Sequence, residues 1–194
     1  MHLPYTMELT RGWRFVHGAA KRWDGIHHGA CYDATKAGHE VGEMDIFLSE
    51  NGWQDVVVPH DWNTEQLASP EHIPSLGFKP RDTGWYFIEP TLPEYPEDAC
   101  VTLEFDGVMG ESVVYVNGVL AGRNESGYTG FAMDVSDYML PGKNQIVVSV
   151  DNRRWEGWWY EGAGIYRPVR LRVQPAVHFA RKATFVRPRP ADRG

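Results

Sequence analysis

Apolar and polar residues alternate along several short stretches of this chain. The alternation is clearest over residues 101–106, 145–151 and 169–174, and a shorter stretch covers residues 13–17. A period of two is typical of a β-strand with one buried face. These stretches are therefore expected to form strands, and in residues 101–106 the polar face includes Glu104, which is expected to be solvated.

The region between residues 111 and 141 adds turn signals to this pattern. Asn117-Gly118 separates two apolar runs and favours a type I′ hairpin turn, because both residues tolerate a positive φ. A short strand over 131–135 and one helical turn over 134–140 are expected to follow, ended by Pro141-Gly142. No long amphipathic helix interrupts the strands, so the pattern predicts an all-β domain, either a β-sandwich or a jelly roll.

Two regions of the sequence, residues 18–51 and residues 176–194, differ from this pattern. Residues 18–51 are polar and rich in glycine, and they are interpreted as a long loop or insertion within a domain that covers residues 1–175, with one helical turn over 43–48. Residues 178–186 read as one more strand, and an Arg/Pro tail follows. Residues 176–194 are therefore interpreted as a linker or as the first strand of a following domain, with an ordinary frayed terminus as the alternative.

Composition narrows the functional classes. The 194 residues carry a formal net charge of −7, which argues against nucleic acid as a partner. No apolar run is long enough to span a membrane, and the first residues lack the apolar core of a signal peptide, so a cytoplasmic protein is expected. Cys31 and Cys100 are interpreted as free thiols, with a single disulfide as the alternative.

The sequence contains no motif that identifies a catalytic or metal centre. It lacks a nucleophile elbow, a P-loop and a zinc-binding spacing, and the adjacent His27 and His28 would diverge on a strand. A glycosidase commonly needs two facing carboxylates, but nothing marks two of the acidic residues as a pair. These residues are Asp61, Asp82, Glu104, Glu111, Glu125, Glu156 and Glu161. The sequence therefore predicts no catalytic residue, no metal and no cofactor.

Two clusters remain as candidate chemistry. The first, residues 56–62, ends a strand at Pro59 and continues with His60-Asp61-Trp62. The second, residues 155–167, places five aromatic residues and three glycines within thirteen positions. Such aromatic rings could stack on sugar rings, or they could form a structural plug that closes the sandwich or packs against another domain. Both interpretations stay open on the residues alone.

Four segments in order resemble the N-terminal domain of glycoside hydrolase family 2, the β-galactosidase and β-glucuronidase group. They are VPHDW at 58–62, TGWYF at 83–87, the long segment 103–139, and WWYEGAGIYRPVRL at 158–171. The resemblance implies a jelly-roll, galactose-binding-like β-sandwich that is often called the sugar-binding domain. In the family an immunoglobulin-like domain and a TIM barrel follow, and both catalytic glutamates lie on the barrel. The resemblance implies that a longer parent enzyme hydrolyses terminal β-glycosides with retention, and that this chain alone is not catalytic.

The resemblance also implies that loops of this domain reach the rim of the active site. Some family members place an aspartate, which contacts a sugar hydroxyl or a bound cation, at the position that Trp158 occupies here, so a sodium site of that type is not carried over. For Arg167 a structural ion pair is favoured over a substrate contact, and for Asp61 the alternative is a carboxylate that caps a turn. The candidate residues of the substrate rim are Asp61, Trp62, Trp158, Trp159 and Glu161.

The implied partners are a carbohydrate and the immunoglobulin-like and TIM-barrel domains of the same polypeptide. The resemblance also allows a homo-oligomer. The alternative function is an autonomous carbohydrate-binding module or lectin, which the aromatic cluster of residues 155–167 motivates.

Overall fold

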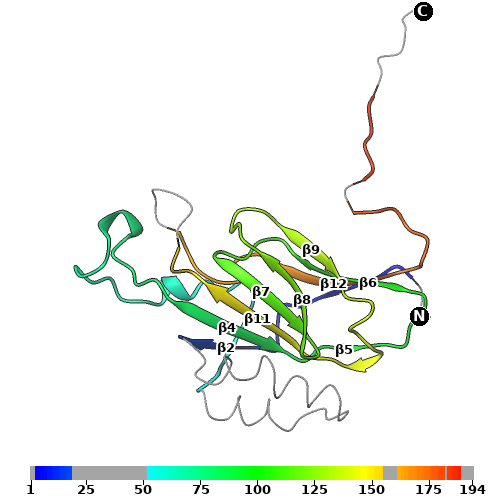
Figure 1. Ribbon diagram of the computed structural model, residues 1–194, viewed down its shortest axis with the longest axis horizontal. Helices are drawn as coiled ribbons and strands as arrows, with labels where there is room; N and C mark the ends of the chain where they lie inside the picture. Colours follow the sequence, from blue (N-terminus) through cyan, green and yellow to red (C-terminus); the bar gives the residue numbers. More distant parts are fainter. Residues whose placement is uncertain (1–2, 19–51, 155–160, 182, 189–194) are drawn as a thin grey trace, which may run out of the picture.

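The alternating stretches form antiparallel strands, as their period of two predicts (Figure 1). The computed structural model describes residues 3–18, 52–154, 161–181 and 183–188. The strands are β1 (Tyr5–Glu8), β2 (Trp13–His17), β3 (Gln54–Val56), β4 (Thr83–Ile88), β5 (Thr91–Leu92), β6 (Cys100–Phe105), β7 (Glu111–Val116), β8 (Val119–Asn124), β9 (Phe131–Asp134), β10 (Gly142–Lys143), β11 (Ile146–Asp151) and β12 (Val169–Gln174). Two short 3₁₀ helices, η1 (Trp62–Thr64) and η2 (Pro74–Leu76), lie between β3 and β4.

The strands form two principal sheets that share one core. The small sheet has the order β1-β12-β6-β9, and the large sheet has the order β3-β2-β4-β11-β7-β8. Strands β5 and β10 pair separately. Every pairing between these strands is antiparallel. The result is a β-sandwich, which confirms the all-β fold class.

Alternate side chains of each central strand fill the space between the sheets. In β6 the inward residues Val101, Leu103 and Phe105 are fully buried, and β12 and β11 bury their alternate apolar residues in the same way. Removing this apolar surface from water is the main force that holds the two sheets together.

The predicted turns are confirmed. Asn117 and Gly118 have φ values of +48° and +80°, as a type I′ turn between β7 and β8 requires. After β9, the N–H groups of Tyr138 and Met139 both donate to the carbonyl oxygen of Val135, which gives one turn of helix. Gly142 follows with a φ of +94°, a conformation that favours glycine.

The prediction for Glu104 is wrong. Its side chain is only 6% exposed, because Arg172 Nε and Arg181 Nε lie 3.1 and 3.4 Å from Glu104 Oε1 and cover it. Arg172 comes from the neighbouring strand β12, whereas Arg181 comes from the segment that follows β12. The alternation correctly assigned Glu104 to the outer face of the sheet, but it carried no information on what covers that face.

The strand predicted over residues 178–186 does not form among the described residues of this run, which pair with neither sheet. After β12 the chain leaves the sandwich (Figure 1). The predicted loop over 18–51 lies outside the described residues except for Gly18, and so does the helical turn over 43–48. Cys31 also lies outside them, whereas Cys100 is a free thiol.

Candidate functional site at the loop end of the sandwich

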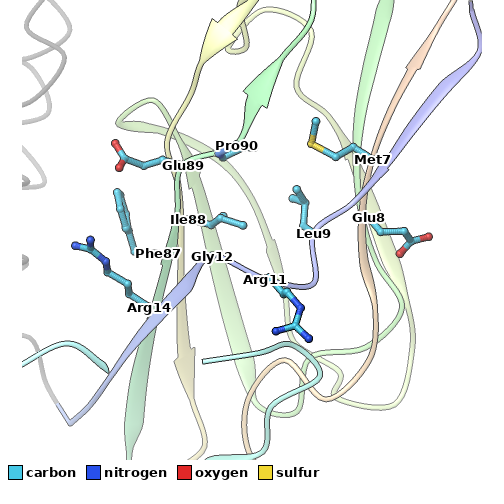
Figure 2. Close-up of a pocket in the computed structure, with 10 residues that line it drawn as sticks. All are labelled: Met7, Glu8, Leu9, Arg11, Gly12, Arg14, Phe87, Ile88, Glu89 and Pro90. Atoms are coloured by element: carbon cyan, nitrogen blue, oxygen red, sulfur yellow. The ribbon is translucent and has the colours of Figure 1, made fainter. Parts of the chain in front are cut away.

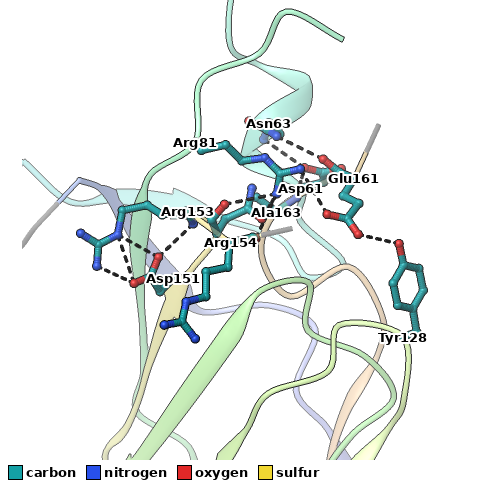
Figure 3. A network of polar contacts seen from close by, with 10 residues as sticks. Asp61, Asn63, Arg81, Tyr128, Asp151, Arg153, Arg154, Glu161 and Ala163 are labelled. Carbon is teal, nitrogen blue, oxygen red and sulfur yellow. Dashed lines mark hydrogen bonds and ion pairs between the residues drawn. The ribbon is translucent and has the colours of Figure 1, made fainter. Parts of the chain in front are cut away.

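Several loops that are far apart in the sequence meet at one end of the sandwich (Figure 3). They are residues 60–64 after β3, residues 81–82 before β4, residues 152–154 after β11 and residues 161–165 before β12, and Tyr128 of the β8–β9 loop also contributes. Two residues of the predicted rim, Asp61 and Glu161, lie in this network.

Asp61 connects two of these loops through its carboxylate. Asp61 Oδ1 accepts hydrogen bonds from the backbone N–H of Asn63, at 3.0 Å, and of Ala163, at 2.8 Å. The first of these bonds makes Asp61 the N-cap of η1. A Cβ on Gly162 would lie 2.1 Å from Asp61 Oδ2, so the contact requires glycine there. Asp61 thus has the turn-capping role that the sequence left as an alternative.

Glu161 is buried, at 3% exposure, and its carboxylate is shared between two partners. Arg81 Nη2 donates to Glu161 Oε2 at 3.2 Å, and the hydroxyl of Tyr128 donates to Glu161 Oε1 at 2.8 Å. In addition, Asn63 Nδ2 donates to the carbonyl oxygen of Glu161 at 3.3 Å. A buried carboxylate needs such partners because it has left the water that would otherwise solvate it.

Trp62 does not present its ring to the rim. It is only 1% exposed and its ring stacks on Phe15, with 5.3 Å between the ring centroids. The chain turns at His60-Asp61 so that Asp61 faces the loops while Trp62 enters the core. Trp62 was expected at the rim because it follows the polar pair His60-Asp61 at a strand end. The local sequence does not indicate that the chain turns there and buries the ring.

His60 and Tyr86 form a second buried contact beneath the same loops. His60 Nδ1 lies 2.7 Å from the hydroxyl oxygen of Tyr86, and the N–H of Ile165 donates to that oxygen at 3.4 Å. The Tyr86 hydroxyl can then donate to Nδ1, which leaves the proton of neutral His60 on Nε2, 3.4 Å from Glu65 Oε1. Burial lowers the pKa of His60, and the nearby Glu65 offsets only part of this effect. Burial also raises the pKa of Tyr86 well above its usual value.

The remaining predicted residues are placed differently. Trp158 and Trp159 lie outside the described residues. Arg167 Nη1 donates to the carbonyl oxygen of Asp106 at 3.4 Å, and the guanidinium lies 4.9 Å from the ring centroid of Tyr166. Among the described residues, these contacts replace the ion pair expected for Arg167.

A separate groove of about 350 Å³ lies where the chain passes from β1 to β2, against the end of β4 (Figure 2). Asp61, Trp62 and Glu161, the described residues of the predicted rim, do not line it. Its two carboxylates are already engaged, since Glu8 pairs with Arg170 at 2.7 Å and Glu89 pairs with Lys143 at 2.8 Å. The groove therefore offers no free pair of carboxylates.

The described residues contain neither a metal-binding cluster nor a membrane-spanning helix. No group of three or more His, Cys, Asp or Glu side chains there could hold a metal ion. No helix in the same part of the chain is long and apolar enough to cross a membrane.

Comparison with known proteins gives the family. Residues 23–175 match the family described as glycosyl hydrolases family 2, sugar binding domain. The chain belongs to this family, and the resemblance found in the sequence is confirmed. The matched region begins within the predicted loop of residues 18–51 and includes all the loops of the network.

Relatives and solved structures agree with this assignment. A β-galactosidase of Bacteroides ovatus is 33% identical over 143 residues, which are 72% of this chain and 17% of that protein. A β-glucuronidase of Formosa agariphila is 30% identical over 152 residues, which are 70% of this chain and 16% of that protein. The structure of a β-glycosidase from Bacteroides vulgatus has a TM-score of 0.69 and 31% identity, covering 87% of this chain and 20% of that one. The chain thus spans about a fifth or less of these proteins.

The residues at this end that escaped sequence reasoning include Arg81, Tyr86 and Tyr128. Each acts through a partner that is 26 to 80 positions away, so no local spacing indicates it. The only available signal was for Tyr86, which lies in the TGWYF segment that carried the family resemblance.

Proposed function

We propose that this chain is a non-catalytic domain of a longer family 2 glycoside hydrolase, in which its loop end borders the substrate site. The class of substrate we propose is a terminal β-galactoside or β-glucuronide, because the relatives include a β-galactosidase and a β-glucuronidase.

The observation that carries the non-catalytic role is the state of the carboxylates. A retaining glycosidase needs two carboxyl groups about 5–5.5 Å apart that can reach the scissile bond. Glu161 and Glu104 are both buried and held by arginines, and Asp61 caps a turn with two backbone hydrogen bonds. These three carboxylates are engaged in contacts within the fold, and this supports a structural role for them in place of a catalytic one.

A second observation supports a larger polypeptide. Val177, Phe179 and Phe185 in the segment after β12 are 91%, 86% and 85% exposed. Several large apolar side chains in one exposed segment favour a surface that another part of the protein covers. We propose that this segment packs against a further domain of the same polypeptide, as expected for the immunoglobulin-like domain of the family.

The test compares the 194-residue chain with the longer polypeptide that contains it. Both are assayed with a chromogenic β-galactoside and a chromogenic β-glucuronide. We expect hydrolysis by the longer polypeptide of at least one substrate and none by the chain. Turnover by the purified chain would refute the non-catalytic role, whereas an inactive longer polypeptide would refute the proposed substrate class.

A carbohydrate-binding module that acts alone is the second candidate, and the family description as a sugar binding domain favours it. It predicts that the chain binds free galactose, glucuronate or an oligosaccharide in titration calorimetry, and that Trp158→Ala weakens the binding. The absence of heat with every sugar would exclude this candidate and would leave the first one standing.

A further inference from the structure

A carboxylate on the outer face of the small sheet contacts a part of the chain that follows β12. Glu104 Oε1 lies 3.1 Å from Arg172 Nε on the neighbouring strand and 3.4 Å from Arg181 Nε, which belongs to no strand. The Glu104 side chain is only 6% exposed, although it alternates with the inward residues Leu103 and Phe105. Its burial therefore comes from groups that lie over the sheet, and Arg181 is one of them.

The register of the small sheet shows that the chain reverses direction to make this contact. Glu104 pairs with Arg170, whereas the end of β12 pairs with Cys100 at the opposite end of β6. Arg181 therefore lies back along the sheet and not beyond its end. Figure 1 shows the corresponding bend in the chain after β12. We call residues 175–181 the exit segment.

The exit segment directs polar side chains towards the small sheet. At its start, His178 Nδ1 donates to the carbonyl oxygen of Pro175 at 2.8 Å, which closes a turn. Hydrogen bonds from Ser136 lower the pKa of Asp134 on β9, and the charge of protonated His178 adds a smaller effect. Together with the contact between Arg181 and Glu104, this gives the exit segment a polar side that faces strands β6 and β9.

The other side of the exit segment is apolar. Val177 and Phe179 lie on either side of His178 in the sequence and are 91% and 86% exposed. Neighbouring exposed apolar side chains on a held segment favour a surface that another part of the protein covers. Holding such a segment before a partner arrives also reduces the conformational entropy that is lost when the two pack together.

We propose that Glu104 is a positioning residue that anchors the exit segment along the small sheet, so that Val177 and Phe179 form an apolar ridge. The occupant we propose for this ridge is an apolar surface of a further domain in the same polypeptide. The length of the relatives supports this occupant, because the chain spans about a fifth or less of the compared proteins. The occupant rests on the proposed function, which supplies the further domain, whereas the anchor rests on the contacts of Glu104 alone.

The first test is cleavage of the 194-residue chain with chymotrypsin, which cuts after aromatic residues. Mass spectrometry gives the ratio of cleavage after Phe179 to cleavage after Phe185. Phe185 is an internal reference, because it is 85% exposed but lies beyond the anchor. The main variant is Arg181→Gln, since it leaves Glu104 paired with Arg172 and so creates no buried charge without a partner. Arg181→Lys keeps the charge and tests whether a conservative change retains the contact.

The matched control is Glu8→Gln. Glu8 lies on the same face of the same sheet, but its partner at 2.7 Å is Arg170 of β12, which is not part of the exit segment. Glu104→Gln is a further variant, and urea unfolding establishes whether it folds.

We expect the cleavage ratio to rise by about three- to fivefold in Arg181→Gln, because loss of a partly exposed ion pair makes local opening easier. The rise should be smaller in Arg181→Lys, and Glu8→Gln should stay within about 1.5-fold of the unchanged chain. Glu104→Gln should raise the ratio at least as much as Arg181→Gln, which decides alone if Glu104→Gln does not fold. An unchanged ratio in Arg181→Gln, or an equal rise in Glu8→Gln, would overturn the anchor.

The second test identifies what covers the ridge. Cleavage after Phe179 is compared between the longer polypeptide and the 194-residue chain, each normalised to a reference peptide in the same sample, and sedimentation gives the mass of the chain in solution. We expect the longer polypeptide to be cleaved at least about tenfold more slowly, and the chain to be a monomer. Equal rates would overturn the proposed occupant, and a dimer that Val177→Asp dissociates would overturn it in favour of a second copy. The first test needs no further domain, so failure of the proposed function is distinguishable from failure of the anchor.

Discussion

Gly164 lies where the loop before β12 crosses over His60 and Tyr86, and Gly164→Ala is the most informative substitution in this domain. The residue has a φ of +110°, and a Cβ there would lie 2.2 Å from the Tyr86 hydroxyl oxygen and 2.9 Å from the carbonyl oxygen of His60. The backbone cannot shift freely to relieve these contacts, because Gly164 exchanges two hydrogen bonds with Met109, at 2.8 and 3.0 Å.

Two effects set the expected loss of stability. An alanine at this positive φ costs about 1–2 kcal/mol. Displacing the Tyr86 hydroxyl from His60 Nδ1 leaves buried polar groups unsatisfied, which lowers the free energy of unfolding by about a further 1–3 kcal/mol. The sum is about 2–5 kcal/mol, a large part of the roughly 5–15 kcal/mol that stabilises a typical native protein.

The assay is unfolding in urea, followed by tryptophan fluorescence, with two matched controls. Gly142→Ala measures the cost of the backbone alone, because Gly142 has a φ of +94° and nothing within 4 Å of its Cβ position. Gly84→Ala measures a clash alone, since its Cβ would lie 2.7 Å from Phe15 Cε2 at a φ that other residues adopt. We expect Gly164→Ala to lose more stability than Gly142→Ala. Equal losses in these two variants would refute the role assigned to the Tyr86 contact.

Three further predictions concern titratable side chains. Burial lowers the pKa of His60 below 6.5, so the unfolded chain takes up the proton first. The contribution of His60 to stability should therefore be complete above pH 6.5 and decline as the pH falls towards the folded pKa. His60→Gln should flatten this decline in the urea midpoint, measured between about pH 7 and 5. An unchanged slope of midpoint against pH would contradict the prediction. Asp61→Ala should cost about 1–3 kcal/mol by leaving two backbone N–H groups without an acceptor, and Asp61→Asn, which keeps one acceptor oxygen, should cost less in the same assay. Glu104→Gln should lower the free energy of unfolding by only about 1–2 kcal/mol, because water screens the two partly exposed arginine partners. It should also speed tryptic cleavage after Arg181. Equal cleavage in the variant and the unchanged chain would show that Glu104 does not hold that segment.

Strands and turns could be predicted because their signals are local. Residues two positions apart point to the same face of a strand, and Asn117-Gly118 determines its turn through the φ values that these two residues tolerate. The predictions at residues 101–106, 145–151 and 169–174 were therefore confirmed as β6, β11 and β12.

The network at the loop end could not be predicted in this way. The pair of Arg81 and Glu161 joins positions 80 residues apart, and the contact of Tyr86 with the loop at Ile165 spans 79. Such contacts exist only once both sheets have assembled. The error at Glu104 has the same origin, because a later segment covers the face that the local pattern marked as exposed.

The place of β12 in the small sheet has a consequence for the order in which the protein can fold. It is the last strand among the described residues, yet it lies between β1 and β6, and Tyr5 pairs with Val173 across nearly the whole sequence. Among the described strands, β1 pairs only with β12, so it lacks this partner until residues 169–174 have left the ribosome during synthesis. A chain that stops before them lacks a central strand of this sheet. Pairings of such long range slow folding, because the chain loses the entropy of closing a large loop before the stabilising contacts form. Until β12 arrives, the apolar faces of β1 and β6 stay open to chaperones, and to aggregation with other unfinished chains.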